Sequence, residues 1–553
     1  MKENNPIYDY YNAIKSGEIL VSKKIYQALD MIMKVLDDEN EWTFDFDLYE
    51  KSVDFVEQFC RHSKGVFANK PIILELWQKA IMATIFGIVN KYTKLRKYHE
   101  ALVVVARKNG KSTWASAIAN YMLVGDGENG SEVYAVAVKR EQAEIVFNES
   151  MKMRNKSPML LKHVYKNKTA LEFRRTESIY KPLASEVKSG DGLNGHCYIM
   201  DEVHAWRKQE LYNLCKGSLG SRLQPLLFLI STAGTVRESV FDSQYSYAER
   251  VLNGKINVDN YIAFIFELDD PEEWLDPEMF EKANPNLGVS IKKKWLIDYM
   301  EKAKSSPSEV VTFKTKHCNI RENSINSWIS FHDIKENDQT FEFSEWQDGY
   351  VVGGIDLSST TDLTCATLLR PIDDEKIEIR QMYFIPKEKA LLKVQQDQIK
   401  YDVWEKQGYI RFTEGSKVNY SEVTNWFNEV VNEHEMVVLG IGYDSWNAQY
   451  LTTELENEGY KMIEVRQGYK TLSPNMKLLE ADFLDRKVIF NNNPVLTWCL
   501  TNTSTMTDPA GNIKPVKTGG EKSNLRIDGF ASLLDAYVIY QSKRDDFDFI
   551  NSL

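Results

Sequence analysis

Short apolar runs alternate with segments of helical periodicity in the first half of the chain. Four runs, each of a length typical of one buried strand, lie at residues 101–106, 132–138, 195–200 and 225–230. Two segments between them, 114–124 and 139–153, carry apolar residues at helical spacing. Because alternating strands and helices pack as a parallel sheet, the pattern predicts a parallel sheet covered by helices.

The residues on either side of this region follow other patterns. Apolar spacing near the N-terminus predicts helices at 8–14, 23–36 and 48–60. A further apolar stretch from residue 71 leads into a helix that we expect to end near residue 89. From 262 to 345, clusters of Pro, Asn and Gly and runs of charge favour a lid and linker subdomain. Two helices are expected within it, at 292–304 and 308–318.

The pattern changes again near residue 350. Three strands are expected in succession, at 351–359, 364–370 and 376–384. A helix around 389–406, a strand at 436–442, a helix from Trp446 and a last helix opened by 525–530 follow. Three hairpin-linked strands, a helix and a further strand resemble the topology of ribonuclease H, so we expect a mixed α/β domain here.

Composition limits the size and location of the protein. The 553 residues, 43% of them hydrophobic, correspond to about three or four folded units. Six scattered cysteines without a CxxC pair favour a reducing compartment and argue against zinc or a disulfide framework. The apolar stretch 71–90 is interrupted by Glu75 and Lys79, and Met1–Asn5 does not open a signal peptide. We therefore expect a cytoplasmic protein without membrane contact.

The first apolar run breaks into a basic turn, Arg107-Lys108-Asn109-Gly110-Lys111-Ser112-Thr113. A turn between a strand and a helix is the setting of a phosphate-binding loop, whose backbone N–H groups and helix N-terminus face the phosphates. Lys111 is then expected to neutralise the β- and γ-phosphates, and the Ser112 hydroxyl to bind Mg²⁺. The usual motif has a further glycine where this chain has Val105, so a buried strand with a surface turn stays an alternative.

A second segment matches the other half of a nucleotide site. The run at 195–200 ends in Asp201 and Glu202, expected to hold the magnesium shell and to activate water, respectively. Ser231 and Thr232 end another strand, where small polar side chains can sense a γ-phosphate. The pairing of these segments with the loop predicts ATP and Mg²⁺ as cofactors. Gln78, before the loop, is expected either to contact adenine or to cap a helix.

Acidic residues mark the last unit. Asp356 lies in the first expected strand, Asp444 follows the strand 436–442, and Asp528 opens the last helix, with Asp535 further along it. A buried carboxylate is costly unless neutralised, and converging carboxylates favour divalent cations. Two ions about 3.5–4 Å apart would activate water and stabilise the leaving oxygen in phosphodiester cleavage. Capping of a helix is the alternative, most of all for Asp535.

Together, the loop 107–112, the Met200-Asp201-Glu202 strand, Ser231–Gly234 and the three aspartates, in this order, resemble the large terminase subunit of tailed bacteriophages. The resemblance extends from about residue 10 to residue 540 and includes the Asn-Pro-Asn-Leu-Gly stretch at 284–288. It implies an ATP-driven motor that moves double-stranded DNA into a procapsid, and a Mg²⁺- or Mn²⁺-dependent endonuclease, with two ions, that cuts concatemeric DNA.

The resemblance also implies roles for single residues. Arg107 would act near the γ-phosphate as an arginine finger in cis, Glu202 would be the catalytic glutamate, and Arg222 is a weaker candidate for a finger that reaches a neighbouring subunit. The residues expected to bind ATP and its Mg²⁺ are Gln78, Arg107, Lys108, Asn109, Gly110, Lys111, Ser112, Thr113, Asp201, Ser231 and Thr232. Those expected at the nuclease metal site are Asp356, Asp444 and Asp528, with Asp535 undecided.

The implied partners are double-stranded DNA, the portal protein and the small terminase subunit. A homo-oligomeric ring on the capsid, possible monomers in solution, and a location in the host cytoplasm with transient docking on the procapsid are also implied. The net charge of −12 gives no general attraction to DNA, so contacts with DNA would depend on local basic surface and be sensitive to salt.

These features predict an α/β protein with a P-loop NTPase sheet and a ribonuclease H-like nuclease domain. The expected parts are an N-terminal helical segment at 1–65, a P-loop ATPase domain at 66–261, a lid and linker at 262–345, a nuclease domain at 346–545 and a tail at 546–553. Two alternatives stay open. A superfamily 2 helicase would need a second RecA-like domain, and a transposase or integrase would need a sequence-specific DNA-binding module; we find neither in the sequence.

Overall fold

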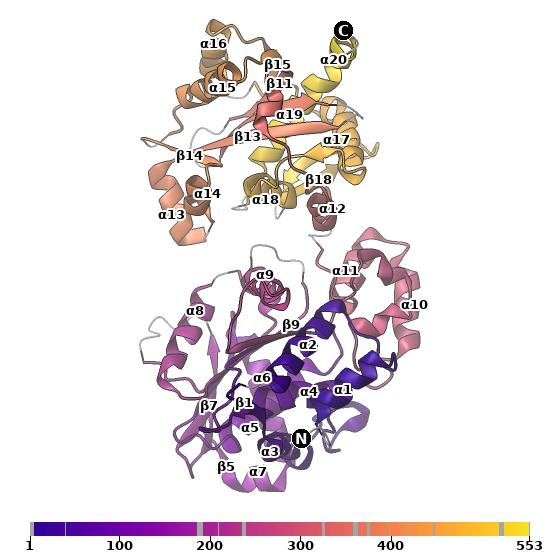
Figure 1. The fold of residues 1–553 in the computed structure, drawn as a ribbon, viewed down its shortest axis with the longest axis vertical. Helices are drawn as coiled ribbons and strands as arrows, with labels where there is room; N and C mark the ends of the chain where they lie inside the picture. The colour runs from indigo at the N-terminus through magenta and orange to yellow at the C-terminus, as the bar shows by residue number, and fades with distance from the viewer. Residues whose placement is uncertain are drawn as a thin grey trace. The chain divides into compact units, whose positions relative to one another are not determined.

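The computed structural model describes residues 5–551 except 39, 185–191, 208, 235–238, 323–326, 358–362, 373–375, 398, 416, 446–447 and 519–524. The chain forms two compact units, Met1–Glu322 and Asn323–Leu553 (Figure 1). Each unit has its own sheet and its own buried apolar core.

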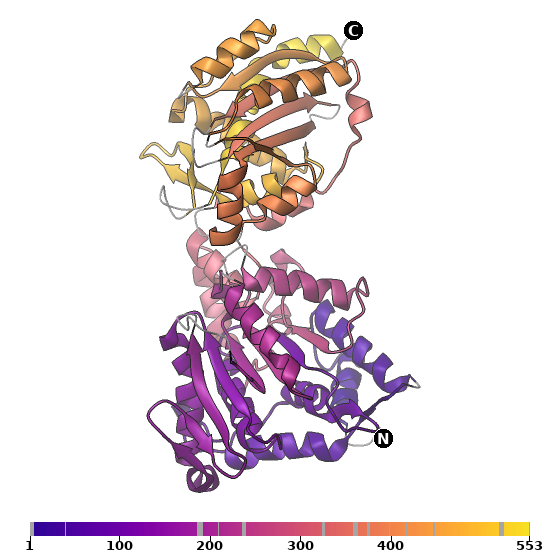
Figure 2. The ribbon, with the colours of Figure 1, turned by 90° about the vertical axis from the view of Figure 1, so that its left-hand side faces the viewer.

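The first unit is built on an eight-stranded sheet, whose strands lie side by side in Figure 2. In spatial order they are β10 (Tyr261–Ile265), β3 (Glu100–Val104), β9 (Leu226–Ser231), β8 (Cys197–Asp201), β4 (Glu132–Ala137), β7 (Ser178–Ala184), β6 (Leu171–Phe173) and β5 (Val164–Lys166). The first six are parallel, and the last two pair antiparallel. Strands buried on both faces read as continuous apolar runs, which is why the sequence revealed β3, β4, β8 and β9.

The helices of this unit precede the sheet in the chain, connect its strands or follow its last strand. They are α1 (Pro6–Lys15), α2 (Lys23–Asp37), α3 (Phe46–Phe59), α4 (Leu76–Met82), α5 (Lys111–Val124), α6 (Arg140–Lys156), α7 (Pro158–His163), α8 (Glu210–Gly217), α9 (Val240–Leu252), α10 (Lys293–Ala303) and α11 (Pro307–His317). The helix expected to reach residue 89 is shorter. It ends in a π-turn at Ala83–Gly87, after which the β-branched pair Ile88 and Val89 lies in β2 (Ile88–Asn90), antiparallel to β1 (Trp42–Phe44).

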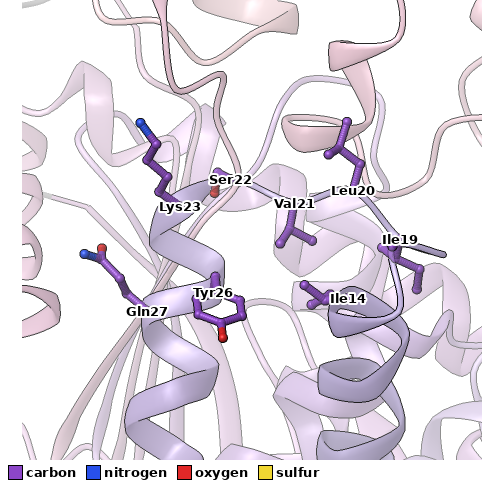
Figure 3. Close-up of a pocket in the computed structure, with 9 residues that line it drawn as sticks. Ile14, Ile19, Leu20, Val21, Ser22, Lys23, Tyr26 and Gln27 are labelled. Atoms are coloured by element: carbon purple, nitrogen blue, oxygen red, sulfur yellow. The ribbon is translucent and has the colours of Figure 1, made fainter.

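A pocket of about 480 Å³ lies where α1 leads into α2 (Figure 3). Its lining is mainly apolar, with Ile14, Ile19, Leu20 and Val21 beside Tyr26. None of the residues predicted to bind nucleotide or metal lines it.

The second unit has a mixed sheet with the strand order β14 (Ile410–Thr413), β13 (Ile377–Pro386), β12 (Thr364–Pro371), β11 (Tyr350–Asp356), β15 (Val437–Tyr443) and β16 (Met462–Glu464), with β17 (Val488–Ile489) paired to β13. The strands β11, β12 and β13 are antiparallel, whereas β15 is parallel to β11. This arrangement confirms the ribonuclease H-like topology.

Helix α19 (Asp528–Ser542) packs very closely on this sheet. A Cβ atom at Gly354 of β11 would come within 2.8 Å of Ala536 Cβ, and one at Gly442 of β15 within 2.6 Å of the Asp535 carbonyl. Only glycine fits at these two positions, because real Cβ contacts are never this short.

The remaining helices of this unit are α12 (Phe331–Glu336), α13 (Lys387–Asp397), α14 (Tyr401–Lys406), α15 (Ser421–Glu433), α16 (Gln449–Asn457), α17 (Tyr469–Leu484), α18 (Pro494–Asn502) and α20 (Arg544–Asn551). The single helix expected around 389–406 is thus two helices. The helix expected from Trp446 begins at Gln449, and Trp446 itself, like residues 358–359, lies outside the described residues. An unexpected hairpin joins β18 (Thr503–Thr507) and β19 (Ile513–Lys517).

No described helix is long and apolar enough to cross a membrane. All six cysteines are buried and unbridged.

Candidate functional sites

The basic turn lies at the carboxyl ends of three parallel strands. It connects β3 to α5, and the neighbours of β3 are β9 and β10. Lys108 and Gly110 have left-handed backbone conformations, with φ of 71° and 80°. Gly110 directly precedes α5, so the loop lies at the positive end of a 14-residue helix, where backbone N–H groups favour an anion.

Lys111 is buried and folded back on its own loop. Its Nζ donates to the carbonyls of Val105 at 3.0 Å and Ala106 at 3.3 Å. Burial lowers the pKa of Lys111, while the nearby carboxylates of Glu202 and Asp201 act to raise it. The ammonium therefore bonds to its own loop and lies within the electrostatic field of the acidic strand.

The structure brings the two halves of the predicted nucleotide site together. The Ser112 hydroxyl donates to Asp201 Oδ2 at 3.1 Å, and the Glu202 N–H donates to Asp201 Oδ1 at 2.9 Å. Burial, followed by the charge of Glu202, raises the pKa of Asp201 to about 6. A cation beside Ser112 and Asp201 would lower this pKa again.

Glu202 has the opposite shift, because a histidine supports it. Burial acts to raise its pKa, but the hydrogen bond with His204 and the charge of Lys111 outweigh burial and lower the pKa to about 2. Glu202 Oε2 lies 3.0 Å from His204 Nδ1, and Glu202 has a left-handed φ of 53°. A carboxylate held ionised in this way can orient and polarise a water molecule through hydrogen bonds.

His204 also contacts the strand that ends in hydroxyls. The backbone N–H of His204 donates to Ser231 Oγ at 3.0 Å. The ring Nδ1 lies 3.2 Å from Ser231 Oγ and 3.4 Å from Thr232 Oγ1. The imidazole packs so closely on Gly234 that a Cβ there would overlap it. No role was predicted for His204, since nothing in its spacing from Ser231 indicates the contact.

Three other residues predicted to bind nucleotide differ in their exposure and contacts. Arg107 is exposed, and its charge lowers the pKa of Glu202 and of His317, so it lies in the same field. Thr113 is half-buried on α5. Gln78 is buried, and its Oε1 accepts the Glu75 N–H at 3.0 Å as part of a capping box at the start of α4. The capping alternative for Gln78 is thus realised, and a contact with adenine stays a prediction.

Arg222 lies shortly before β9, at the amino ends of the parallel strands and thus opposite the phosphate loop. Its guanidinium donates to Glu128 Oε1 at 2.9 Å and to the carbonyls of Gly130 at 2.7 Å and Asn194 at 3.2 Å. These contacts give Arg222 a role in joining three loops of its own chain, and a role towards a second subunit stays a prediction.

In the second unit, four aspartates surround one end of the sheet. Asp356 ends β11, and Asp444 follows the neighbouring parallel strand β15. Both residues therefore lie at the carboxyl ends of these two strands. Asp528 and Asp535 are buried on α19. Burial, and then the charges of Asp528, Asp535 and Asp444, raise the pKa of Asp356 well above its usual value, although Lys517 acts in the opposite direction.

Asp535 belongs to this group more firmly than the sequence suggested. Burial raises its pKa, as does the charge of Asp444, while Gln467 Nε2 donates to Asp535 Oδ1 at 3.1 Å and opposes the shift. Within the described residues, however, no three acidic, His or Cys side chains stand close enough to hold one metal ion as they are oriented. The four carboxylates share an electrostatic field without converging on one point.

Comparison with known proteins assigns both halves of the chain to one family. The family model "Terminase large subunit, ATPase domain" matches residues 76–250, and "Terminase large subunit, endonuclease domain" matches 255–543, more than half of the chain. The terminase large subunit of Enterobacteria phage HK97 is 27% identical over 491 residues, which cover 88% of this chain and 94% of that protein. Protein YmfN of Escherichia coli K12 is 28% identical over 367 residues, 63% of this chain and 78% of YmfN.

Among solved structures, the crystal structure of the HK97 bacteriophage large terminase aligns with 25% sequence identity and a TM-score of 0.46. The alignment covers 89% of this chain and 99% of that one.

Proposed function

This chain belongs to the terminase large subunits, and we propose which of its residues carry out the two activities of that family. It is an ATPase and a DNA endonuclease, which uses nucleotide and divalent metal to package and cut DNA. The alternative of a superfamily 2 helicase with a fused nuclease is not favoured, because the two halves of the chain match the ATPase and endonuclease models of the terminase family.

In the proposed ATPase site, the phosphate loop holds the phosphates of ATP. Lys111 turns from the carbonyls of Val105 and Ala106 to the β- and γ-phosphates, and Glu202 polarises the attacking water. Arg107 in cis stabilises the developing charge. The hydrogen bond between Ser112 and Asp201 is the observation that carries this proposal, since it joins the two halves of the site. Mg²⁺ would be held by these two residues and would neutralise phosphate charge.

Ser231 and Thr232 are proposed to report the loss of the γ-phosphate to the rest of the unit. Support comes from His204, which contacts both of these residues and Glu202. A change in the charge of Glu202 or its water would thus reach β9 through one imidazole.

In the proposed nuclease site, Asp356, Asp444 and Asp528 hold the metal, with Asp535 as a further candidate. A set of carboxylate oxygens fits Mg²⁺ or Mn²⁺, and the mutual repulsion that raises the pKa of Asp356 is what such an ion would relieve. We propose two ions, which would activate water and stabilise the leaving oxygen.

The proposed partners are double-stranded DNA, the portal protein and the small terminase subunit. We propose a homo-oligomeric ring on the procapsid in the host cytoplasm. With a net charge of −12, DNA binding should depend on local basic surface and weaken with salt.

The test is to measure ATP hydrolysis with and without DNA, and metal-dependent cleavage, on the same purified chain. We expect DNA-stimulated hydrolysis and cleavage that stops in EDTA. Strand-separating activity with a defined polarity would instead support the helicase.

A further inference from the structure

The phosphate loop is shaped by contacts from outside it. Where the usual motif has its first glycine, this chain has Val105, whose side chain is fully buried. A loop with fewer glycines has less freedom to adopt the strained turn that cradles phosphate, so other groups must hold it there.

Asn109 is the first of these groups. Its side chain is fully buried inside the loop rather than turned towards a ligand. Nδ2 donates to the Ala106 carbonyl at 3.0 Å and to Asn284 Oδ1 at 3.0 Å, and Oδ1 accepts the N–H of Asn286 at 3.0 Å. The amide thus links the loop to a segment about 175 residues later.

Asn286 continues the network in the direction of α4. Its Nδ2 donates to the Asn109 carbonyl at 3.1 Å, and its Oδ1 accepts Trp77 Nε1–H at 2.7 Å. Trp77 itself packs edge-on against Trp114 of α5 and Phe266 after β10. Asn286 is therefore held between the loop and a rigid aromatic cluster.

Backbone groups of the same region complete the contact. The Ala106 N–H donates to the Ala283 carbonyl at 3.2 Å, and the Arg107 N–H donates to the Lys316 carbonyl at 2.8 Å, near the end of α11. The Ser290 hydroxyl donates to the Lys108 carbonyl at 2.6 Å. Each residue from 106 to 109 thus bonds to the 283–316 region.

We propose that Asn109, Asn284 and Asn286 are positioning residues, which hold the phosphate loop in its binding conformation from the 283–316 region. Nucleotide binding and the packing of that region are then coupled. If the packing strengthens nucleotide binding, nucleotide binding stabilises the packing by the same free energy. This inference rests on the proposed ATP site.

The test uses the full chain and a fluorescent ATP analogue. We expect Asn286→Ala and Asn109→Ala each to weaken binding roughly ten-fold. The double variant should lose much less than the product of the two, because each variant removes different hydrogen bonds but loosens the same attachment of the loop to the 283–316 region. Trp77→Phe, a milder change that removes the donor to Asn286 but keeps the packing, should weaken binding a few-fold.

Asn120→Ala is the matched control. Asn120 is an equally buried asparagine on α5 whose Nδ2 donates to the Ser150 carbonyl at 3.4 Å, away from the loop. Its replacement should lower the melting temperature without changing affinity. The inference is overturned if folded Asn286→Ala and Trp77→Phe bind as the wild type does, or if Asn120→Ala weakens binding equally. If Lys111→Ala binds normally, the proposed ATP site fails as well.

Discussion

Asp201 and Asp535 are buried carboxylates, and Glu202 and Asp356 are half-buried ones, but the surroundings of the pair in the first unit differ from those of the pair in the second. The first pair lies beside Lys111, and the pKa of Glu202 is lowered. In the second group, aspartates act on one another, and the pKa values of Asp356 and Asp535 are both raised.

The difference shows how far the protein itself balances the charge of each site. In the first unit, Lys111 offsets part of the negative charge and Glu202 is held ionised, although burial and the charge of Glu202 raise the pKa of Asp201 to about 6. In the second unit, the negative charge is in excess and needs a cation to become stable. Removing one charge should therefore have opposite effects on stability in the two places.

The largest expected effect is that of Lys111→Ala on ATP hydrolysis. Loss of the charge that faces the phosphates should lower the rate about 100- to 1,000-fold. Metal-dependent cleavage should persist, and the protein should become less stable, because Asp201 and Glu202 lose their cation. Hydrolysis assays and thermal unfolding check both parts, and normal hydrolysis would contradict the assignment of the loop.

Asp356→Asn should give the mirror result. We expect cleavage to fall about 100-fold or more, comparable to removing a major electrostatic group from a site, while hydrolysis continues. In EDTA this variant should melt at a higher temperature than the wild type, because one repelling charge has gone. Intact cleavage would refute the nuclease assignment, and a lower melting temperature would refute the contrast drawn between the two sites.

Asp126 offers a balanced cluster outside either site. It pairs with Arg96 and lies 2.7 Å from His196 Nε2. Burial acts to raise its pKa, but Arg96 and His196 outweigh burial and lower the pKa from 3.8 to about 2. Asp126→Asn should lower the free energy of unfolding by about 3–5 kcal/mol at pH 7, since it leaves a buried guanidinium uncompensated.

The effect of pH on this cluster has a definite sign. Because the folded-state pKa of Asp126 lies below the unfolded one, its stabilisation is complete above about pH 4 and is lost as the pH falls towards 2. Urea titrations should show the gap between wild type and Asp126→Asn narrowing by about 2 kcal/mol over that range. A gap that is constant down to pH 2 would contradict the ion pair.

Gln78→Ala should have the smallest effect. Loss of the capping box is expected to cost about 1 kcal/mol of stability. If Gln78 also contacts adenine, the preference for ATP over GTP should fall a few-fold in competition binding. An unchanged preference would leave the capping box as the role of Gln78 and show that charge, rather than this amide, governs the first site.

The sequence predicts those parts of the fold that depend on local pattern. Buried parallel strands have continuous apolar runs, and the loop before α5 has its own motif. The hairpin β18–β19 was not predicted, because Pro515 lies within β19 and its repeat of apolar positions is weak. Part of the first site was predicted: Ser112 and Asp201 were expected in one nucleotide site, and their side chains are hydrogen-bonded to each other. Their roles towards Mg²⁺ stay a prediction.

Contacts between distant segments could not be read from the sequence. His204 reaches Ser231 only because β8 and β9 pair in a register that no local pattern fixes. Asn109 and Asn286 are 177 positions apart, and asparagine is common in loops, so neither residue alone signals the contact.

The bare backbone at Gly354 and Gly442 has one last consequence. At these two positions α19 packs against bare backbone, so its distance from β11 and β15 there does not depend on a rotamer of either glycine. Each of these glycines carries only a hydrogen atom where another residue would carry Cβ. A methyl group added at either position would push α19 away from the strands. We expect its first effect to be a changed preference between smaller and larger cations at the nuclease site.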